Sequence, residues 1–571
     1  MPSEPAGAFA HQSGASRHRS VRALAVMALF VTVLALFVRG WALEQSGLQN
    51  DEQIWHERSA RFVQSVLGPL APTANLQLPK TFWPVEHVDL RHDARALATG
   101  WPFSIVMPAH HPGVPISFAI GLSYLLLAEG SSDWSLGVGS VIEVARYPNV
   151  LVGTLLCLVI FFGGRRIVGD NAALMAAGLA AVEPLLVGYS RLARLDLSVA
   201  FWSTLAVFLL LEARHRNRRI WAAASGACVG LAFATNPYGL FILPTLLAAR
   251  LLYPGSGDGL LRRVRMYRSR FWLWPDRLDS VVAVAIPVAF ILAYPNLWPN
   301  PAAGLYRMLD VLGMLPHVTG QIPPRMPLSP LFYGMRLPEH VLPWTLTLAG
   351  LGAVAGLAIR PRAVVLLLVW ILSFLALLSI PPGYKEVKNA LSVLPPLLLL
   401  AGLGGAAIVA WLERSLARRA GQAALVIGFG ALVAAGLYAT SAWWPYPKNY
   451  TWPWRPDPQT QAVRELIGEG EGIREALAYI RAQGPSGARV GTFTGRNNAE
   501  YYYPENLLGD PVRPEDLATY DWLLVLPKLT FSGPDTHPLV AWIRSREPTH
   551  VVRQHQIELV RLYRLDANAT R

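Results

Sequence analysis

Long apolar runs separated by short polar stretches dominate the chain up to residue 443. The first run covers residues 23–38. Further runs lie near residues 147–164, 171–189, 196–212, 220–235, 238–253, 280–294, 340–359, 363–380, 391–411 and 422–443. Such runs predict transmembrane helices, although several are short for a hydrocarbon core about 30 Å thick. The pattern therefore predicts an α-helical, polytopic bundle of about eleven spans.

The apolar stretch 114–128 needs a separate argument, because it is only about fifteen residues long and begins with prolines. If it crossed the membrane, Arg165-Arg166, the Arg214–Arg219 cluster and the run Arg262–Arg270 would all face outward. Cytoplasmic loops normally carry the excess of Lys and Arg. We therefore expect this stretch to lie in the outer interface or to re-enter, within a large first outer loop over residues 44–146.

Charge near the N-terminus orients the chain. Arg17, Arg19 and Arg22 precede the first apolar run, which places an N-terminal tail over residues 1–22 in the cytoplasm. The run has no clear small-x-small cleavage site, so an uncleaved anchor is favoured over a removed signal peptide. Arg39 at its outer end is expected to snorkel to the lipid headgroups. The transmembrane domain then covers residues 23–443.

The pattern changes after residue 443, where the chain becomes more polar. Residues 472–483 form an amphipathic helical pattern, and residues 489–493, 522–526 and 550–563 are typical of strands. A further short helix is expected over residues 539–545. These elements predict a small α/β domain over residues 444–571, entered through the Pro- and Trp-rich linker 445–458. The charge pattern places this domain outside the cytoplasm.

Composition agrees with a multi-pass protein of the plasma membrane, because 53% of the residues are hydrophobic and only 15% are charged. The net charge of +13 comes mainly from short basic clusters between apolar runs, so it does not indicate nucleic-acid binding. Cys157 and Cys228 both lie inside apolar runs without a second ligand nearby. They are expected to be packing residues.

Ionisable residues gather at the predicted outer ends of the spans. The candidates are Asp51, Glu52, His110, His111, Arg191, Arg194, Asp196, Lys385 and Lys388. Each has a simpler alternative: the acidic pair can be a solvated loop, the histidines a helix start, Arg194 and Asp196 a salt bridge, and the lysines headgroup anchors. Ionisable groups at a membrane boundary also mark substrate paths, and here cations and carboxylates share one depth.

Several of these residues belong to motifs that resemble a known family. The motifs are "NDEQIWHERSARF", "HHPGVP", "SRLARLD" and "YKEVKNALSVLPPLLLLAG", followed by "IGEGEGIREALAYI". In their order and spacing they resemble the C-type glycosyltransferases that use polyprenyl-phosphate sugars, in particular bacterial relatives of protein O-mannosyltransferases and of lipid A aminoarabinose transferase. The resemblance covers nearly the whole chain and implies the C-type glycosyltransferase fold.

The resemblance also implies roles for individual residues. The acid of the first outer loop, which acts on the acceptor nucleophile, falls on Asp51 with Glu52 beside it, and a second acid falls on Asp196. Here His-Pro-Gly stands where relatives often have Lys-Pro-Pro or His-Pro-Pro, which leaves the role of His111 in doubt. A single displacement, with inversion at the anomeric carbon, is implied as well.

The chemistry of such a transfer needs a base for the acceptor hydroxyl and cations for the departing phosphate. We assign Asp51, Glu52 and Asp196 to catalysis. The residues assigned to the donor phosphate are His110, His111, Arg191, Arg194, Lys385 and Lys388. No metal ligands are assigned, and the sequence leaves a divalent metal requirement open.

The expected partners are a polyprenyl-phosphate-linked sugar donor, the lipid bilayer and a protein, lipid or glycan acceptor, with no nucleic acid. The main alternative is a transporter or flippase for a lipid-linked glycan, which would place ionisable groups near the middle of the membrane in broken helices. The third hypothesis is a non-catalytic assembly protein. The chain has no Walker-type, His-Glu-x-x-His or Gly-x-Ser-x-Gly motif, which argues against ATP-driven transport, zinc proteolysis and serine hydrolysis.

Overall fold

A computed structural model provides the structure of the chain. It describes residues 21–49, 52, 55–56, 58–60, 62–63, 113–127, 141–253, 276–295, 298, 331–380, 386–415, 418–452, 470–493, 499, 502–503, 507–509, 514–527 and 538–565.

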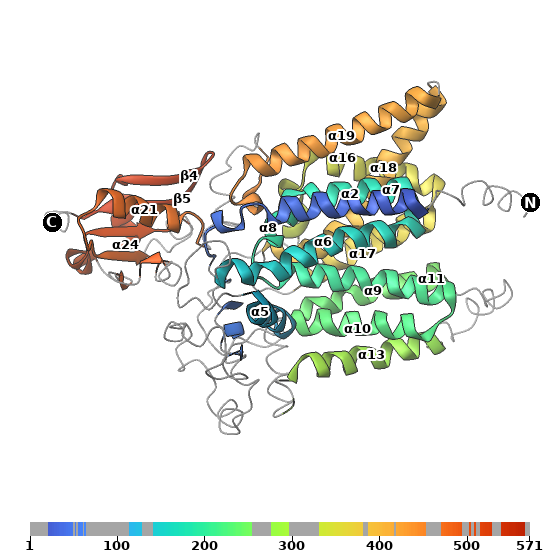
Figure 1. Cartoon of the computed structure of the whole chain (residues 1–571), viewed down its shortest axis with the longest axis horizontal. Coiled ribbons are helices and arrows are strands. Elements are labelled where there is room, and N and C mark those ends of the chain that lie inside the picture. The colour runs from blue at the N-terminus through green and yellow to red at the C-terminus, as the bar shows by residue number, and fades with distance from the viewer. Residues whose placement is uncertain are drawn as a thin grey trace, which may run out of the picture.

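Long helices lie side by side and form the main body of the molecule (Figure 1). Each apolar run that the sequence predicted contains a helix. Their bounds are α2 Val21–Gly40, α6 Val141–Val168, α7 Asp170–Val182, α8 Pro184–Ser190, α9 Asp196–Arg216, α10 Arg219–Thr235, α11 Leu243–Leu252, α13 Arg277–Ala293, α16 Pro343–Ile359, α17 Pro361–Ser379, α18 Leu394–Ser415 and α19 Arg418–Ala442. Short helices η1 (Leu43–Gln45), η5 (Pro237–Ile242), α15 (Phe332–Arg336), η8 (Leu337–His340), η9 (Val387–Val393) and η10 (Pro447–Asn449) connect or extend them.

The helices identify a multi-pass membrane protein, as predicted, but do not fix the number of spans. In the described part of the chain five helices are long and apolar enough to cross a membrane, or up to seven if each bent pair counts as one span. One bent pair is α7 with α8, which meet at 59°. The other joins residues 332–340 to α16 at 120°. The figure of about eleven spans therefore stays a prediction.

Small residues allow the closest helix contacts. A Cβ atom added to Gly352 of α16 would lie 1.8 Å from the carbonyl oxygen of Leu400 in α18, and one on Gly404 would lie 2.0 Å from the carbonyl oxygen of Leu348. The backbones of α16 and α18 therefore touch directly. Because lipid tails are as apolar as leucine, such close packing is a main source of helix association in a membrane.

Helix α5 (Val114–Leu127) is oriented differently from the long helices. It lies at the end of the bundle nearest the C-terminal domain and is seen nearly end-on, whereas α6, α9 and α10 run along the long axis (Figure 1). Its residues Val114, Ile120 and Tyr124 are fully buried, while Leu126 is 70% exposed. The stretch therefore does not run alongside the long helices, and its place in the outer interface or in a re-entrant segment stays a prediction.

The two ends of the bundle differ as the charge pattern predicted. Helices α6, α9 and α18, which carry arginines in their last turns, end at the side remote from the C-terminal domain (Figure 1). Helices α17 and α19 begin at that same side. A hydrogen bond of 3.1 Å from the Arg360 guanidinium to the carbonyl oxygen of Ile167 joins two of these turns.

The prediction that Arg39 snorkels to the headgroups is wrong. Its side chain is only 1% exposed and turns into the bundle. It donates hydrogen bonds to the carbonyl oxygens of Ala180 (2.9 Å) and Ala181 (3.0 Å) and to the hydroxyl of Ser190 (3.1 Å). The break between α7 and α8 leaves carbonyl groups without helical partners, and Arg39 supplies donors there. Cys157 and Cys228 are both buried, which confirms their packing role.

The C-terminal domain is a mixed five-stranded sheet in the order β2-β1-β3-β5-β4. The strands are β1 Val490–Phe493, β2 Leu507–Gly509, β3 Trp522–Val525, β4 His550–Gln554 and β5 Ile557–Arg564, with helices α21 (Ile473–Gln483) and α24 (Pro538–Arg544). Strand β1 is parallel to β2 and β3, and β5 is antiparallel to β3 and β4. The fold confirms the predicted α/β domain, to which β2 is an addition that the sequence pattern did not indicate.

Candidate functional site

The structure describes five of the nine predicted site residues: Glu52, Arg191, Arg194, Asp196 and Lys388. The other four, Asp51, His110, His111 and Lys385, lie outside the described residues. The five described residues lie around the end of the bundle that faces the C-terminal domain. They come from the acidic pair, the loop before α9 and the lysine segment.

Glu52 forms a fully buried ion pair with Arg146 of α6. The Nε and Nη2 atoms of Arg146 donate to the two carboxylate oxygens of Glu52 at 2.9 Å each, and neither side chain is exposed. The backbone N–H groups of Gln49 (3.1 Å) and Ala193 (2.8 Å) also donate to this carboxylate. Burial alone would raise the pKa of Glu52, but the charge and hydrogen bonds of Arg146 outweigh it and lower the pKa below its usual range.

Arg146 also organises the backbone that leads to the acidic pair. Its Nη1 atom donates to the carbonyl oxygens of Leu43 (2.8 Å) and Ser46 (3.0 Å), and its Nη2 atom donates to that of Gly47 (3.0 Å). A planar guanidinium can serve a carboxylate and several carbonyls at once, which a lysine cannot. Arg146 was not among the residues singled out from the sequence.

Arg191 binds the backbone at the end of α2. It donates to the carbonyl oxygens of Arg39 (3.0 Å), Trp41 (2.6 Å) and Ala42 (2.8 Å), and its guanidinium lies 3.8 Å from the ring centroid of Trp444. These contacts hold the C-terminal end of α2 and give Arg191 a structural role. Its predicted contact with a donor phosphate stays a prediction.

Asp196 is the first residue of α9, where the helix dipole favours a carboxylate. The Nε atom of Arg194 lies 3.3 Å from its Oδ2 atom, and both side chains are buried, so the salt bridge named as the simpler alternative is present. The side-chain amide of Asn149 donates to the carbonyl oxygens of Leu192 and Arg194, both at 2.5 Å. This loop is therefore held rigidly against α6.

Lys388 lies on η9, which packs against α9 although the two are far apart in the sequence. It forms an ion pair with Glu386, and both side chains are largely buried. The phenol of Tyr238 interacts electrostatically with Glu386, Lys388 and Asp196. The side chain of Asn389 donates a long hydrogen bond of 3.4 Å to the hydroxyl of Tyr333. The fold thus packs the element that carries a predicted cation against the helix that begins with a predicted acid.

The two groups of residues are continuous. Ala193, whose N–H donates to Glu52, precedes Arg194 by one residue and Asp196 by three. The loop between α8 and α9 therefore connects the Glu52–Arg146 pair to Asp196 and to the helix against which η9 packs. Sequence reasoning missed Tyr238 and Asn149, because a lone tyrosine or asparagine near a helix end has no distinguishing pattern.

His56 lies in the first outer loop near the Glu52–Arg146 pair. Its Nδ1 atom is 2.7 Å from the hydroxyl of Tyr124 in α5, and its side chain is fully buried. Burial lowers the pKa of His56 to about 4, so the imidazole is neutral at pH 7. The backbone of Gly113 packs on Trp55 so closely that an added Cβ would lie 2.1 Å from the indole, which gives the glycine of His-Pro-Gly a packing role.

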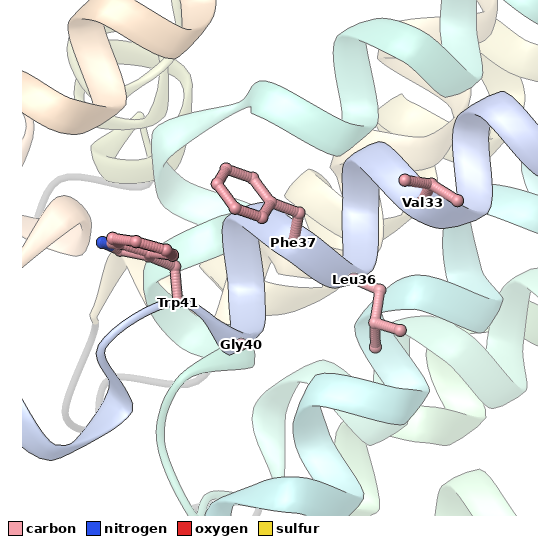
Figure 2. Close-up of a pocket in the computed structure, with 5 residues that line it drawn as sticks. All are labelled: Val33, Leu36, Phe37, Gly40 and Trp41. Carbon is pink, nitrogen blue, oxygen red and sulfur yellow. The ribbon is translucent and has the colours of Figure 1, made fainter.

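An apolar groove of about 390 Å³ runs along the C-terminal end of α2. Val33, Leu36, Phe37, Gly40 and Trp41 line it, and Figure 2 shows the four side chains other than Gly40 projecting from the last turns of the helix and the residue after it. The rings of Phe37 and Trp41 are 5.3 Å apart between centroids. An apolar, exposed surface of this kind suits a lipid chain.

No group of three His, Cys, Asp or Glu side chains is arranged to hold a metal ion within the ranges that the structure describes.

Solved structures and family comparisons give the following similarities. ArnT from Cupriavidus metallidurans bound to undecaprenyl phosphate is 15% identical, with a TM-score of 0.49 over 95% of this chain and 98% of that chain. The archaeal oligosaccharyltransferase AglB from Archaeoglobus fulgidus, in complex with an inhibitory peptide and a dolichol-phosphate, is 12% identical, with a TM-score of 0.45 over 88% of this chain and 69% of that chain. No curated relative matches the chain. Residues 134–268 match the family described as dolichyl-phosphate-mannose-protein mannosyltransferase, which confirms over this stretch the resemblance that the motifs predicted.

Proposed function

We propose that this chain is an integral-membrane glycosyltransferase of the plasma membrane. It transfers a sugar from a polyprenyl-phosphate donor to an acceptor hydroxyl outside the cytoplasm. The observation that carries the proposal is the packing of η9, which holds the Lys388–Glu386 ion pair, against α9, whose first residue Asp196 pairs with Arg194. The family match over residues 134–268 supports the same class of reaction.

In the proposed step the acceptor oxygen forms a bond with the anomeric carbon as the bond from that carbon to the phosphate oxygen breaks. The proton of the acceptor hydroxyl passes to the carboxylate of Asp51, and the electron pair of the broken bond leaves with the polyprenyl phosphate. Such a base contributes about 10²–10⁴-fold to a rate. A single displacement inverts the configuration of the anomeric carbon.

The remaining residues divide into two groups in this proposal. Lys388 and Arg194, with Lys385 and the histidines 110 and 111, offset the charge that develops on the departing phosphate. Glu52 holds Asp51 in place through its buried pair with Arg146, and Asp196 orients the donor sugar or the cations beside it. The N-terminal tail then lies in the cytoplasm and the C-terminal domain outside.

The test is turnover by the purified chain with a panel of polyprenyl-phosphate sugars, read out as released polyprenyl phosphate. Transfer to a hydroxyl acceptor, with product of the opposite anomeric configuration, is the expected result. Loss of this activity in Asp51→Asn assigns it to the predicted site. Movement of a lipid-linked glycan across the membrane of vesicles, without release of polyprenyl phosphate from any donor, would establish the transporter hypothesis instead.

A further inference from the structure

The C-terminal domain contacts both segments that lead to the predicted acids. One is the stretch 43–49, which precedes Asp51 and Glu52, and the other is α8, which precedes the loop with Arg194 and Asp196. We propose that the C-terminal domain positions these two segments for transfer, with the buried hydroxyl of Tyr446 as its central contact. The inference rests on the proposed function, because it assigns the domain a part in the same reaction.

Tyr446 joins three parts of the chain through one oxygen atom. Its side chain is only 2% exposed, and its hydroxyl accepts hydrogen bonds from the backbone N–H groups of Gly47 and Gly472, both at 3.2 Å. The same hydroxyl donates to the carboxylate of Glu475 at 3.3 Å. Gly47 belongs to the first outer loop, whereas Gly472 and Glu475 belong to the start of α21. A buried hydroxyl with three partners fixes their relative positions.

Further contacts hold the same stretch to the C-terminal domain. The hydroxyl of Tyr502 accepts a hydrogen bond of 2.6 Å from the N–H of Leu48. Arg474 of α21 donates to the carbonyl oxygen of Glu44 at 2.8 Å. The segment that leads to Asp51 is therefore bonded on one side to Arg146 of the bundle and on the other to the C-terminal domain.

The linker reaches α8 by direct backbone packing. A Cβ atom added to Gly188 would lie 2.3 Å from the backbone nitrogen of Lys448, so the two backbones are in contact. The side chain of Lys448 forms a fully buried ion pair with Glu471, which precedes α21. The described part of the linker, residues 445–452, is therefore packed against the bundle, although domains joined by exposed linkers commonly move.

This arrangement predicts an effect on catalysis without direct contact with substrate. Misplacing a reacting group by about 1 Å can reduce a rate by about 100-fold. Tyr446→Phe keeps the ring and removes the hydrogen bonds to Gly47, Gly472 and Glu475. We expect kcat to fall at least about tenfold, while the KM values for donor and acceptor stay within about twofold.

A matched control separates positioning from damage to the domain. The hydroxyl of Tyr563 donates a 3.4 Å hydrogen bond to the carbonyl oxygen of Ile543 inside the C-terminal domain. Tyr563→Phe removes a buried hydroxyl there without touching the stretch 43–49, so kcat should stay at the wild-type value. Faster hydrogen exchange of the peptide that contains Gly47 and Leu48 should accompany Tyr446→Phe and not Tyr563→Phe.

A second pair of variants tests the contact with α8. Gly188→Ala forces the linker away from α8 and should lower kcat, whereas Gly350→Ala of α16, where an added Cβ meets nothing within 4 Å, should not. Wild-type kcat and unchanged hydrogen exchange in Tyr446→Phe would refute the inference, as would equal losses in Tyr446→Phe and Tyr563→Phe. If Tyr446→Phe does not fold, Tyr502→Phe takes its place with the same expected and contrary results.

The exchange measurement also keeps the two proposals apart. It needs no turnover, so altered protection of Gly47 and Leu48 supports the positioning contact whatever reaction the chain performs. Absence of sugar transfer by the wild-type protein counts against the proposed function alone. Wild-type transfer together with unaltered kcat in Tyr446→Phe and Gly188→Ala counts against the positioning inference alone.

Discussion

Arg146 and Glu52 form a two-pronged, fully buried ion pair that joins α6 to the first outer loop. Both carboxylate oxygens also accept a backbone N–H, so the pair has no exposure to water and few alternatives for its hydrogen bonds. Removing one partner of such a pair leaves the other charged and buried, which typically costs about 3–5 kcal/mol.

We therefore expect Glu52→Gln to lower the free energy of unfolding by about 3 kcal/mol, and Arg146→Lys to do the same because a lysine cannot form the fork. Denaturation in detergent measures the change. Arg553→Met removes an exposed partner of Glu558 and should change stability by about 1 kcal/mol or less. Wild-type stability in Glu52→Gln would contradict the structural role of the pair.

Asp51 and Glu52 are adjacent but should respond differently to substitution. Asp51→Asn keeps the shape and removes the base, so we expect turnover to fall about 100-fold or more with normal folding. Glu52→Gln should act mainly through stability, with a smaller loss of turnover per folded molecule. Kinetics on purified protein, normalised to the folded fraction, separate the two. If Asp51→Asn turns over at the wild-type rate, Asp196 becomes the leading candidate for the base.

The orientation of the chain predicts where reporter fusions work. A reporter joined after Trp443 should be active only outside the cytoplasm, and one inserted in the Arg214–Arg219 turn only inside. The physical reason is the excess of arginines at the bundle end remote from the C-terminal domain. Phosphatase and fluorescent-protein fusions measure this directly. A C-terminal reporter that is active in the cytoplasm would overturn the orientation and the outward placement of the site with it.

The helices and the sheet domain could be predicted because they depend on local patterns. Apolar runs located the helices, and the strand-like runs 489–493, 522–526 and 550–563 located β1, β3 and the β4–β5 pair, although the division of the last run into two strands was not predicted. Strand β2 is three residues long and pairs with β1, so its formation depends on a neighbour rather than on its own pattern. Charge bias acts on whole loops, and it grouped the described basic turns at one end of the bundle correctly, whereas Arg262–Arg270 lies outside the described residues.

The partners of individual side chains could not be predicted. Arg146 is 94 residues from Glu52 in the chain, and nothing local to either residue indicates the other. Arg191 was interpreted as a phosphate ligand because it is an outward cation. Cations at a span mouth can also bind unpaired carbonyls at a helix end, and Arg191 does this at the end of α2. Sequence alone does not distinguish these two uses.

His56 gives the folded state a distinct pH dependence. Its pKa is about 4 in the buried site and 6.5 in the unfolded chain, so the unfolded state binds more protons between these values. The free energy of unfolding should therefore fall as the pH drops from about 6.5 towards 4, by about 3 kcal/mol in total. Ionised Glu52 also contributes to the free energy of unfolding, and because its pKa is lowered from 4.5, that contribution is lost only at lower pH.

Unfolding measured between pH 7 and pH 5 tests this effect of His56. His56→Gln cannot gain the proton and should flatten the slope in this window. The same substitution at the exposed His215 of α9 is the control and should leave the slope as in the wild type. An unchanged slope in His56→Gln would show that other groups cause the pH dependence.

Lys388 offers the sharpest test of the donor class, because the role proposed for it requires a leaving group that is an anion. In the structure its partner is Glu386, and a donor phosphate would compete with that carboxylate. Lys388→Met keeps the apolar stem and deletes the charge, so donor KM should rise and transfer should slow while acceptor KM stays nearly constant. Lys385→Met should show the weaker form of the same defect. Separate saturation with donor and acceptor measures both.

Glu386→Gln is the matched variant, which should change donor KM in the opposite direction. It removes the competing charge and leaves Lys388 in place, so donor KM should fall relative to the wild type. Headgroup anchoring makes a different prediction for the lysines: lower expression or stability and no kinetic defect. Unchanged donor kinetics in both Lys385→Met and Lys388→Met would exclude the phosphate role.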